Sequence, residues 1–385
     1  MKFRYLKIDL TSQTTYNCHA ALPHRIDFKW LNSNPGNLFN SDVNIAERRM
    51  MLRNERNSSC ETNCWHAEDN GAVSPRMYQC GEDKTHFEPI TTPEILDLTL
   101  NSECNLTCSY CCKEFSNSWR RDLIDNGEYL LSNFDDYRYR LTKEDKILNL
   151  VSQQEMHSSS RFQTLLNEIR SFAPKLKRLD ITGGEPMLDN QLLDMLESFN
   201  LSSECEINLY TGLGVNEKRF EKIITALEKI PNVCIKVSAE SVGEMLEFNR
   251  YGIKYNEFQR KIDILNRAIK WSFHCTITNL NVLGFVDFYN QFPTVPKTIT
   301  FGYQPRFLSP YVMDVGTKEM VKQDIAKLPS LVSQPILQSL ESTPTEEQRI
   351  GLREFLCQFV ERRKNLNLNI FPETFLLWTG VKNVV

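Results

Sequence analysis

Strand and helix signals alternate along residues 93–303, and this alternation is the feature that most restricts the fold. Six short apolar segments have the length and composition of buried strands: 95–100, 176–182, 205–211, 233–239, 272–278 and 297–303. Segments with the 3.6-residue period of amphipathic helices lie between them, at 162–172, 188–199, 217–230 and 255–270. Because strands that alternate with helices at this spacing pair in parallel, the sequence predicts an α/β fold, either a partial (β/α)6 barrel of the TIM type or an open parallel sheet.

The chain divides into three expected domains. A small cysteine-rich domain occupies residues 1–92, the predicted barrel occupies 93–310, and a helical extension occupies 311–385. Residues 113–160 form an insertion in the barrel that is too long for an ordinary connection between a strand and a helix. We expect this insertion to be either a surface excursion or a lid over a substrate.

Two helices are expected outside the barrel. In the first domain, residues 42–54 carry the clearest helical pattern, with Ser41 as N-cap. In the extension, Thr343, Pro344 and Glu346 fit an N-cap, a proline at the first helical position and a capping-box acid. The first domain otherwise has little apolar periodicity, so a bound metal would explain how it folds.

Charge and hydropathy narrow the classes of function. The chain has 45 Lys and Arg residues against 49 Asp and Glu residues, for a net charge of −4, which disfavours nucleic acid as a partner. The N-terminus lacks the apolar core of a signal peptide, and no run of about 18 apolar residues could span a membrane. We therefore expect a cytoplasmic protein without a membrane partner, whose twelve cysteines are not a disulfide framework.

Three cysteines with the spacing C-x3-C-x2-C follow the first predicted strand, namely Cys104, Cys108 and Cys111. Three thiolates on one loop can bind one inorganic centre, and a [4Fe–4S] cube with only three protein ligands keeps one iron open. Cys112 adjoins Cys111 and would have to point away from the same centre. The alternative is a structural zinc site completed by Cys112 or by a histidine.

A glycine-rich turn, Gly183-Gly184-Glu185-Pro186, follows the second predicted strand. Glycines allow the backbone to approach a ligand closely because they lack a Cβ atom. Together, the cysteine loop and this turn resemble the radical S-adenosylmethionine (radical SAM) superfamily. In that family a C-x3-C-x-aromatic-C loop follows the first barrel strand and a GGEP motif ends the second. Tyr110 fills the aromatic position.

The resemblance covers about residues 93–305 and implies contacts with SAM at several strand ends. The GGEP turn would bind the methionine end of SAM, and the other implied contacts are Tyr110, Thr211, Ser238, Glu240, Arg250 and Asn279. Glu240 stands where the family has an Asp, and Arg250 stands where relatives pair an arginine with the SAM carboxylate. The strand ends concerned lie at the carboxyl edge, where barrels of this type place their active sites.

Four further cysteines precede the predicted barrel, namely Cys18, Cys60, Cys64 and Cys80. Residues 60–76 resemble the auxiliary-cluster segment of twitch or SPASM-like domains, matched by Glu68, Gly71, Ser74 and Arg76. Many relatives carry this domain after the barrel, so its position here is shifted. The resemblance implies that the four thiolates hold a second Fe–S cluster. A zinc knuckle on the same cysteines, with His66 able to replace one of them, is the alternative.

The resemblance as a whole implies a radical SAM enzyme. Its [4Fe–4S] cluster would cleave SAM reductively to a 5′-deoxyadenosyl radical, which abstracts hydrogen from a substrate. It also implies a reduced flavodoxin or ferredoxin as the electron donor, and a peptide substrate ahead of a nucleoside or a sugar. A non-enzymatic zinc- or Fe–S-binding interaction protein on a degenerate barrel is the alternative class. The sequence singles out no residue that acts on the substrate.

Overall fold

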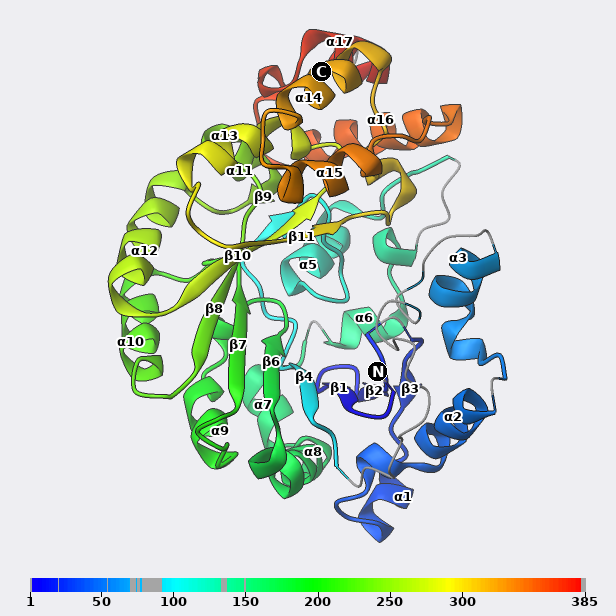
Figure 1. Ribbon diagram of the computed structural model, residues 1–385, viewed down its shortest axis with the longest axis vertical. Helices are drawn as coiled ribbons and strands as arrows, with labels where there is room; N and C mark the ends of the chain where they lie inside the picture. Colours follow the sequence, from blue (N-terminus) through cyan, green and yellow to red (C-terminus); the bar gives the residue numbers. More distant parts are fainter. Residues whose placement is uncertain are drawn as a thin grey trace. The chain divides into compact units, whose positions relative to one another are not determined.

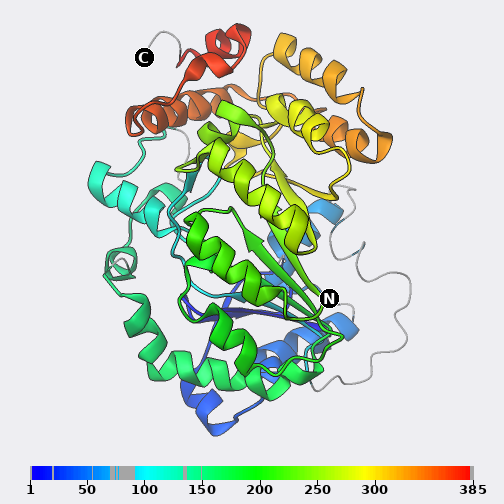
Figure 2. The same cartoon turned by 90° about the vertical axis from the view of Figure 1, so that its left-hand side faces the viewer.

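The computed structural model (Figures 1 and 2) describes residues 2–19, 21–53, 55–69, 74, 77, 92–132, 137–148 and 150–381. The chain forms two compact units. Unit 1 comprises Met1–Asn101, Val151–Leu209 and Thr225–Cys234, and unit 2 comprises Ser102–Leu150, Tyr210–Ile224 and Ile235–Val385. Within the described ranges, no helix has the length and apolar character needed to cross a membrane.

Unit 1 is built on parallel strands flanked by an antiparallel pair. Its strands are β1 (Tyr5–Asp9), β2 (Thr14–Tyr16), β3 (His24–Arg25), β4 (Ile95–Thr99), β6 (Arg178–Thr182) and the first four residues of β7 (Glu206–Thr211). They pair in the order β3-β2-β1-β4-β6-β7, with β1, β4, β6 and β7 parallel. Its helices are α1 (Phe28–Ser33), α2 (Asp42–Leu52), α3 (His66–Asp69), α7 (Gln153–Ser158), α8 (Ser160–Phe172) and α9 (Leu192–Ser198).

Unit 2 continues the same alternation of strands and helices. β8 (Val233–Ser238), β10 (Trp271–Ile277) and β11 (Lys297–Phe301) pair in parallel in that order. The helices that connect and follow these strands are α10 (Glu217–Leu227), which begins in unit 2, α11 (Gly243–Asn249), α12 (Tyr255–Ala268) and α13 (Phe285–Gln291). α10 and α12 lie on the same face of β8 and β10 (Figures 1 and 2). All six strands predicted from the sequence are confirmed, and their parallel pairing within each unit is confirmed, whereas closure into a partial barrel stays a prediction.

Strand β1 is an element that the sequence interpretation missed. It has only five residues, Tyr5–Asp9, too few to show a clear period in a polar segment. It nevertheless pairs with β4 along its whole length, and its Leu6 and Ile8 are fully buried. Residues 1–92, predicted to be a separate polar domain, therefore contribute a strand to the central sheet of unit 1.

A network of buried charged and polar side chains holds the amino-terminal segment together. The ammonium group of Lys2 lies 2.6 Å from the Glu47 carboxylate and donates to Ser59 Oγ at 2.7 Å. His24 Nε2 lies 3.0 Å from the same carboxylate, which also accepts a hydrogen bond from the Asn17 amide. Buried polar groups are tolerated when they are paired. This network therefore stabilises the amino-terminal segment by itself, whereas the sequence suggested a bound metal as the stabilising element.

Glu47 makes the stability provided by this network dependent on pH. Burial disfavours its ionised form, but the hydrogen bonds from His24, Lys2 and Asn17 more than offset burial and hold its pKa below its ordinary value. A carboxyl group with a lowered folded-state pKa adds stability that is present above its unfolded pKa and is lost as pH falls through the folded pKa.

We expect Glu47→Gln to lower the free energy of unfolding at pH 7 by about 3–5 kcal/mol, because it leaves the Lys2 charge buried without its partner. The measurement is urea unfolding followed by circular dichroism. Glu55→Gln is the control, since Glu55 meets Arg53 at 3.6 Å on the surface, and it should change the free energy by less than about 1 kcal/mol. The difference between wild type and Glu47→Gln should shrink below about pH 4.3. A difference that stays constant from pH 7 to pH 3 would contradict the ionic network.

As far as Leu150 the insertion belongs to unit 2, and it packs into the core of that unit where it is described. It contains α5 (Asn117–Asn126) and α6 (Lys143–Leu148), and the carboxyl-terminal extension contains α14 (Val315–Ile325), α15 (Ser330–Ser339), α16 (Glu346–Glu361) and α17 (Glu373–Thr379). Rings of the insertion pack against rings of α16: the centres of Trp119 and Phe359 lie 6.1 Å apart, and Tyr129 stacks on Phe355 at 5.6 Å. This part of the insertion is a core element of unit 2 rather than a loose surface excursion.

The start of α16 corrects one prediction. Its N-cap is Thr345, and Gln348 completes the capping box, in place of Thr343, Pro344 and Glu346. Two capping-box patterns overlap in this sequence, Thr343 with Glu346 and Thr345 with Gln348, and both satisfy the capping rule. The second one is used, and Pro344 precedes the cap. The expected helix at 42–54 is confirmed as α2, although Ser41 stands at its N-cap without a capping side-chain bond.

Candidate active site

The three cysteines of the C-x3-C-x2-C motif lie on one loop of unit 2. Cys104 and Cys108 are buried and Cys111 is half-buried. Burial raises the pKa of the Cys111 thiol well above its ordinary value, and the neighbouring Cys112, Cys108 and Cys104 raise it further. Thiolates crowded together in a dry site repel one another, and a bound cation relieves that repulsion. The loop therefore brings the three cysteines close enough for their thiols to affect one another's ionisation.

A zinc ion and a [4Fe–4S] cluster differ in how closely their thiolate ligands must converge. Among the described residues, no group of three or more His, Cys, Asp or Glu side chains is placed to hold a metal ion. A structural zinc ion needs four donors around one point. In a [4Fe–4S] cluster each thiolate binds a different iron, which requires less convergence of the sulfur atoms. A cluster on Cys104, Cys108 and Cys111, and a zinc site completed by Cys112 or a histidine, both stay predictions.

The beginning of α5 holds the backbone of the cysteine loop through four consecutive side chains. Ser116, Asn117, Ser118 and Trp119 hydrogen-bond to backbone groups of Leu106, Cys104, Cys104 and Cys108, in that order, over 2.5–3.0 Å. These bonds orient two of the three thiols from outside the loop. A loop that is held in this way keeps its shape without a bound ligand.

A two-stranded antiparallel sheet joins the cysteine loop to a distant part of the chain. Its strands are β5 (Thr107–Cys108) and β9 (Arg250–Tyr251), with Cys108 opposite Arg250. Beside the pair, Ser109 donates from its backbone N–H to Asn249 O at 2.8 Å and from its hydroxyl to Asn249 Oδ1 at 2.9 Å. The register therefore places Arg250 beside a candidate metal ligand.

Gly252 is required for this close approach. Its φ is +108°, and a Cβ atom there would lie 2.8 Å from the carbonyl oxygen of Asn105 in the cysteine loop. Gly243 also has a positive φ, +56°, but a Cβ atom there would meet nothing within 4 Å. The two positions share backbone strain and differ in contact with the loop.

We expect Gly252→Ala to displace the cysteine loop and Gly243→Ala to leave it in place. Both variants adopt a backbone conformation that costs an L-residue about 1–2 kcal/mol, so both should melt at a lower temperature. Only Gly252→Ala should increase the number of thiols that react rapidly with a thiol reagent in the metal-free protein. Equal thiol reactivity in the two variants would show that Gly252 does not support the loop.

Three of the predicted SAM contacts form a buried network in unit 2. Glu240, which is fully buried, accepts hydrogen bonds from the Tyr110 hydroxyl at 2.8 Å and from Thr276 N at 3.1 Å. Arg250 donates to the same carboxylate from Nη2 at 2.7 Å and from Nε at 3.3 Å. Its Nη1 lies 3.9 Å from Cys108 Sγ. Tyr110, Glu240 and Arg250 are thus brought together beside Cys108, a predicted cluster ligand.

The protonation states in this network follow from burial and from charge. Burial opposes the charge on Arg250, but Glu240, Tyr110 and Cys108 more than offset it and raise the pKa of the guanidinium well above its ordinary value. Burial also raises the pKa of Tyr110 well above its ordinary value. The phenol is therefore neutral, and its hydroxyl donates to the Glu240 side chain.

The carboxyl-terminal extension reaches the cysteine loop through Arg363, which sequence reasoning did not identify. Arg363 is buried, and its Nε donates to Thr107 Oγ1 at 3.1 Å, next to Cys108. Its Nη1 donates to the Tyr129 hydroxyl at 3.0 Å, and its guanidinium carbon lies 4.8 Å from the centre of the Trp119 ring. The only sequence signal was a basic run at the end of an amphipathic helix, which usually indicates a solvated helix end.

The GGEP turn lies in unit 1, where its first glycines contact the protein itself. Gly183 has φ +149°, and a Cβ atom there would lie 2.7 Å from Asn101 O. The same oxygen accepts the Gly184 N–H at 2.9 Å, and buried Glu185 accepts the Met187 N–H at 3.2 Å. The need for Gly183 is explained by this backbone contact. The contacts of the turn with SAM, Pro186 included, stay predictions.

Asn101 is a second residue that sequence reasoning missed. It is buried at the end of β4, and its amide donates to the Asp189 carboxylate at 2.5 Å. His157, also buried, lies 3.2 Å from the same carboxylate. An isolated Asn after a strand and an unpaired His in the sequence carry no signal for such a cluster. The cluster of Asn101, Asp189 and His157 keeps Asn101 in place, and the backbone oxygen of Asn101 accepts the Gly184 N–H of the turn.

The remaining predicted contacts are placed as follows. Thr211 is buried and its hydroxyl accepts the Leu213 N–H at 2.9 Å, and Ser238 is half-buried at the end of β8. Asn279 is fully buried, and its amide nitrogen donates to Phe307 O at 2.9 Å and to Val312 O at 3.0 Å. The predicted contact of Asn279 with SAM is thereby restricted to its carbonyl oxygen.

The amino-terminal cysteines are only partly described. Cys18, Cys60 and Cys64 are buried in unit 1, and the Ser74 hydroxyl donates to Glu68. Cys80, Gly71 and Arg76 lie outside the described residues. The four-cysteine ligand set therefore stays a prediction.

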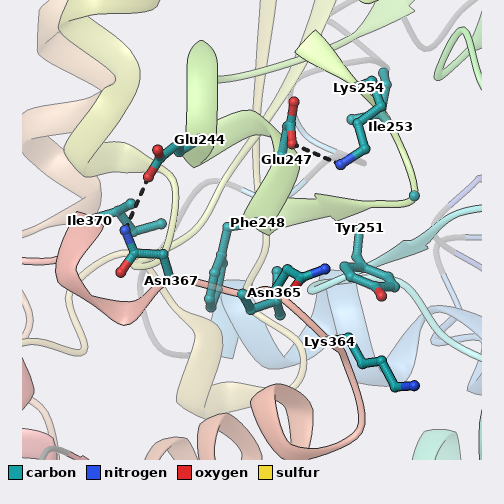
Figure 3. Close-up of a pocket in the computed structure, with 12 residues that line it drawn as sticks. Glu244, Glu247, Phe248, Tyr251, Ile253, Lys254, Lys364, Asn365, Asn367 and Ile370 are labelled. Carbon is teal, nitrogen blue, oxygen red and sulfur yellow. Dashed lines mark hydrogen bonds and ion pairs between the residues drawn. The ribbon is translucent and has the colours of Figure 1, made fainter.

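A cavity of about 340 Å³ opens beside β9 in unit 2 (Figure 3). Tyr251 lines it, together with a Glu247–Lys254 ion pair of 3.4 Å and with Glu244, which accepts a hydrogen bond from Asn367 at 3.2 Å. None of the predicted cysteine ligands or SAM contacts is among its lining residues. The cavity is therefore on the other side of β9 from the Arg250 network, since neighbouring strand residues point to opposite faces.

Comparison with known proteins finds only distant likenesses. No model of a known protein family matches the sequence, and no curated protein matches it. The fold is similar to that of Streptococcus suis SuiB bound to S-adenosylmethionine, at 13% identity and a TM-score of 0.35, over 86% of this chain and 68% of that chain. It is also similar to SuiB bound to its precursor peptide SuiA, at 11% identity and a TM-score of 0.35, over 87% and 70%. These likenesses are too distant to assign a ligand or partner of SuiB to this chain.

Proposed function

We propose that this protein is a radical SAM enzyme whose [4Fe–4S] cluster is held by Cys104, Cys108 and Cys111. The observation that carries the proposal is a C-x3-C-x2-C loop whose backbone is held by side chains of α5 and by pairing with β9. When bound, a cluster with one open iron supplies the electron that cleaves SAM to a 5′-deoxyadenosyl radical, which then abstracts hydrogen from a substrate.

The chain's own residues would bind the cluster and SAM, orient them, and exclude water from the site. The three thiolates hold the cluster, and the α5 residues keep the loop backbone in place. Glu185, which is 1% exposed, can accept a charge-assisted hydrogen bond from the ammonium group of SAM. Tyr110, Glu240 and Arg250 close the site on one side of Cys108 with charges that are paired with each other. Burial of these groups keeps water away from a reactive intermediate.

Single substitutions in the motif test the cluster ligands. We expect Cys104→Ala, Cys108→Ala and Cys111→Ala to lose the iron of this cluster and the formation of 5′-deoxyadenosine from SAM under dithionite, because each removes one of three ligands. Cys112→Ala is the matched control, since Cys112 is a buried cysteine next to Cys111 that lies outside the C-x3-C-x2-C spacing. The measurements are iron per chain after anaerobic purification and 5′-deoxyadenosine by chromatography.

Two results would contradict this proposal. Loss of iron in Cys112→Ala with iron retained in Cys104→Ala would show that the ligands are assigned wrongly. A colourless wild-type protein that contains zinc would favour the alternative class, a zinc-binding interaction protein without SAM chemistry.

We propose in addition that Cys18, Cys60, Cys64 and Cys80 hold a second Fe–S cluster. The described three are buried and lie in one unit. A Cys60→Ala, Cys64→Ala, Cys80→Ala triple variant should lose part of the iron while it still forms 5′-deoxyadenosine. Cys357→Ala, a half-buried cysteine on α16, is the control. Unchanged iron in the triple variant would contradict the second cluster, and loss of zinc in place of iron would support the zinc knuckle.

The electron donor and the substrate belong to the same proposal. We propose a reduced flavodoxin or ferredoxin as donor, and a peptide as substrate ahead of a nucleoside or a sugar, on the resemblance of the sequence motifs alone. Transfer of deuterium from a labelled candidate into 5′-deoxyadenosine would identify the substrate class, because the radical takes its hydrogen from the substrate.

A further inference from the structure

We infer that Arg250 and Glu240 form a buried charge pair that acts on the cluster through Cys108 and raises the reduction potential of the cluster. The inference rests on the proposed function and changes the role of Arg250, which the sequence resemblance assigned to the SAM carboxylate. Arg250 is in this view a positioning residue for a cluster ligand.

The backbone register is the first observation. Arg250 lies opposite Cys108 in the β5–β9 pair, so its position is set by main-chain hydrogen bonds and not by a flexible loop. Arg250 is 4% exposed, whereas the next residue, Tyr251, lines the cavity in Figure 3. Because alternate residues of a strand face opposite sides, the guanidinium is directed to the side away from that cavity.

The surroundings of the guanidinium are the second observation. Its Nη2 and Nε both donate to Glu240, its Nη1 lies 3.9 Å from Cys108 Sγ, and its central carbon lies 5.5 Å from the centre of the Tyr110 ring. The edge that carries Nε and Nη2 is thus taken by an internal carboxylate. A ligand carboxylate could then bind in a bidentate way only at the Nη1/Nη2 edge, and Nη1 faces Cys108 Sγ there.

The fixed position of Glu240 is the third observation. Its carboxylate accepts hydrogen bonds from Tyr110 and from Thr276 N in addition to those from Arg250. The pair is therefore held with its positive end toward Cys108 and its negative end anchored elsewhere. In a buried site the interaction of such fixed charges is much less screened than in water.

The charges predict the sign of the effect. Reduction adds one negative charge to the cluster, and a nearby positive charge that faces a ligand sulfur stabilises the reduced form. Removing the Arg250 charge should make the cluster harder to reduce. Removing the Glu240 charge should make it easier to reduce, because Arg250 then acts without its counter-ion.

The experiment is a redox titration of the reconstituted full-length protein without SAM, followed by electron paramagnetic resonance. Arg250→Gln should lower the equilibrium constant for reduction about tenfold, or about 59 mV for a one-electron couple, and Glu240→Gln should raise it. Lys254→Gln is the matched control, because it removes a charge four residues from Arg250 whose side chain is 68% exposed. It should leave the potential unchanged. SAM affinity is then titrated for each variant.

The outcomes separate the inference from the proposed function. Shifts of opposite sign in Arg250→Gln and Glu240→Gln support the inference. Unchanged potentials with weakened SAM binding in Arg250→Gln overturn it and return Arg250 to the SAM carboxylate, and shifts of the same sign overturn it as an effect of loosened structure. If Arg250→Gln holds no iron, Arg250→Lys, which keeps the charge, should have a potential close to wild type, and a large shift there would overturn the inference. A wild-type chain without an Fe–S cluster refutes the proposed function before any variant is compared.

Discussion

The antiparallel pairing of Cys108 with Arg250 is the interaction on which the site in unit 2 depends. The two residues are 142 positions apart in the chain, and two short strands bring them together. The pairing is possible because Gly252 lets the backbone approach Asn105, and Arg363 of the extension holds Thr107 beside it. The insertion and the extension thus act as supports for a loop of about ten residues. Long-range support of this kind is what keeps a ligand set within the tolerance that metal chemistry needs.

The elements that could be predicted from the sequence are those whose signal is local. Six parallel strands were found because buried strands in a parallel sheet are continuous apolar runs, and the helices between them because their apolar residues recur every 3.6 positions. β1 could not be predicted, since Tyr5–Asp9 is short and its partner β4 lies about ninety residues away. The start of α16 was misplaced because two capping patterns overlap and only tertiary packing chooses between them.

In the candidate site, too, residues in local motifs could be predicted and residues that act through long-range contacts could not. The cysteine spacing and the GGEP turn are local motifs, and the residues that they identify, from Cys104 to Cys111 and from Gly183 to Pro186, could be named without a structure. The partners of these motifs could not. Asn101 and Arg363 are single polar residues without a motif around them. Their contacts with the GGEP turn and with the cysteine loop join segments far apart in the sequence, so only the structure shows them. In unit 1, likewise, Lys2 and Glu47 are ordinary charged residues until they are seen buried together.

The length of the Glu240 side chain matters to the site in unit 2. It reaches Tyr110, Arg250 and the Thr276 backbone at once. The carboxylate is fully buried and saturated by these donors. The carboxylate is therefore the anchor of an internal charge pair with Arg250. The SAM contact predicted for this strand end would be easier for half-buried Ser238, at the end of β8, than for buried Glu240, because Glu240 would first have to give up these internal bonds.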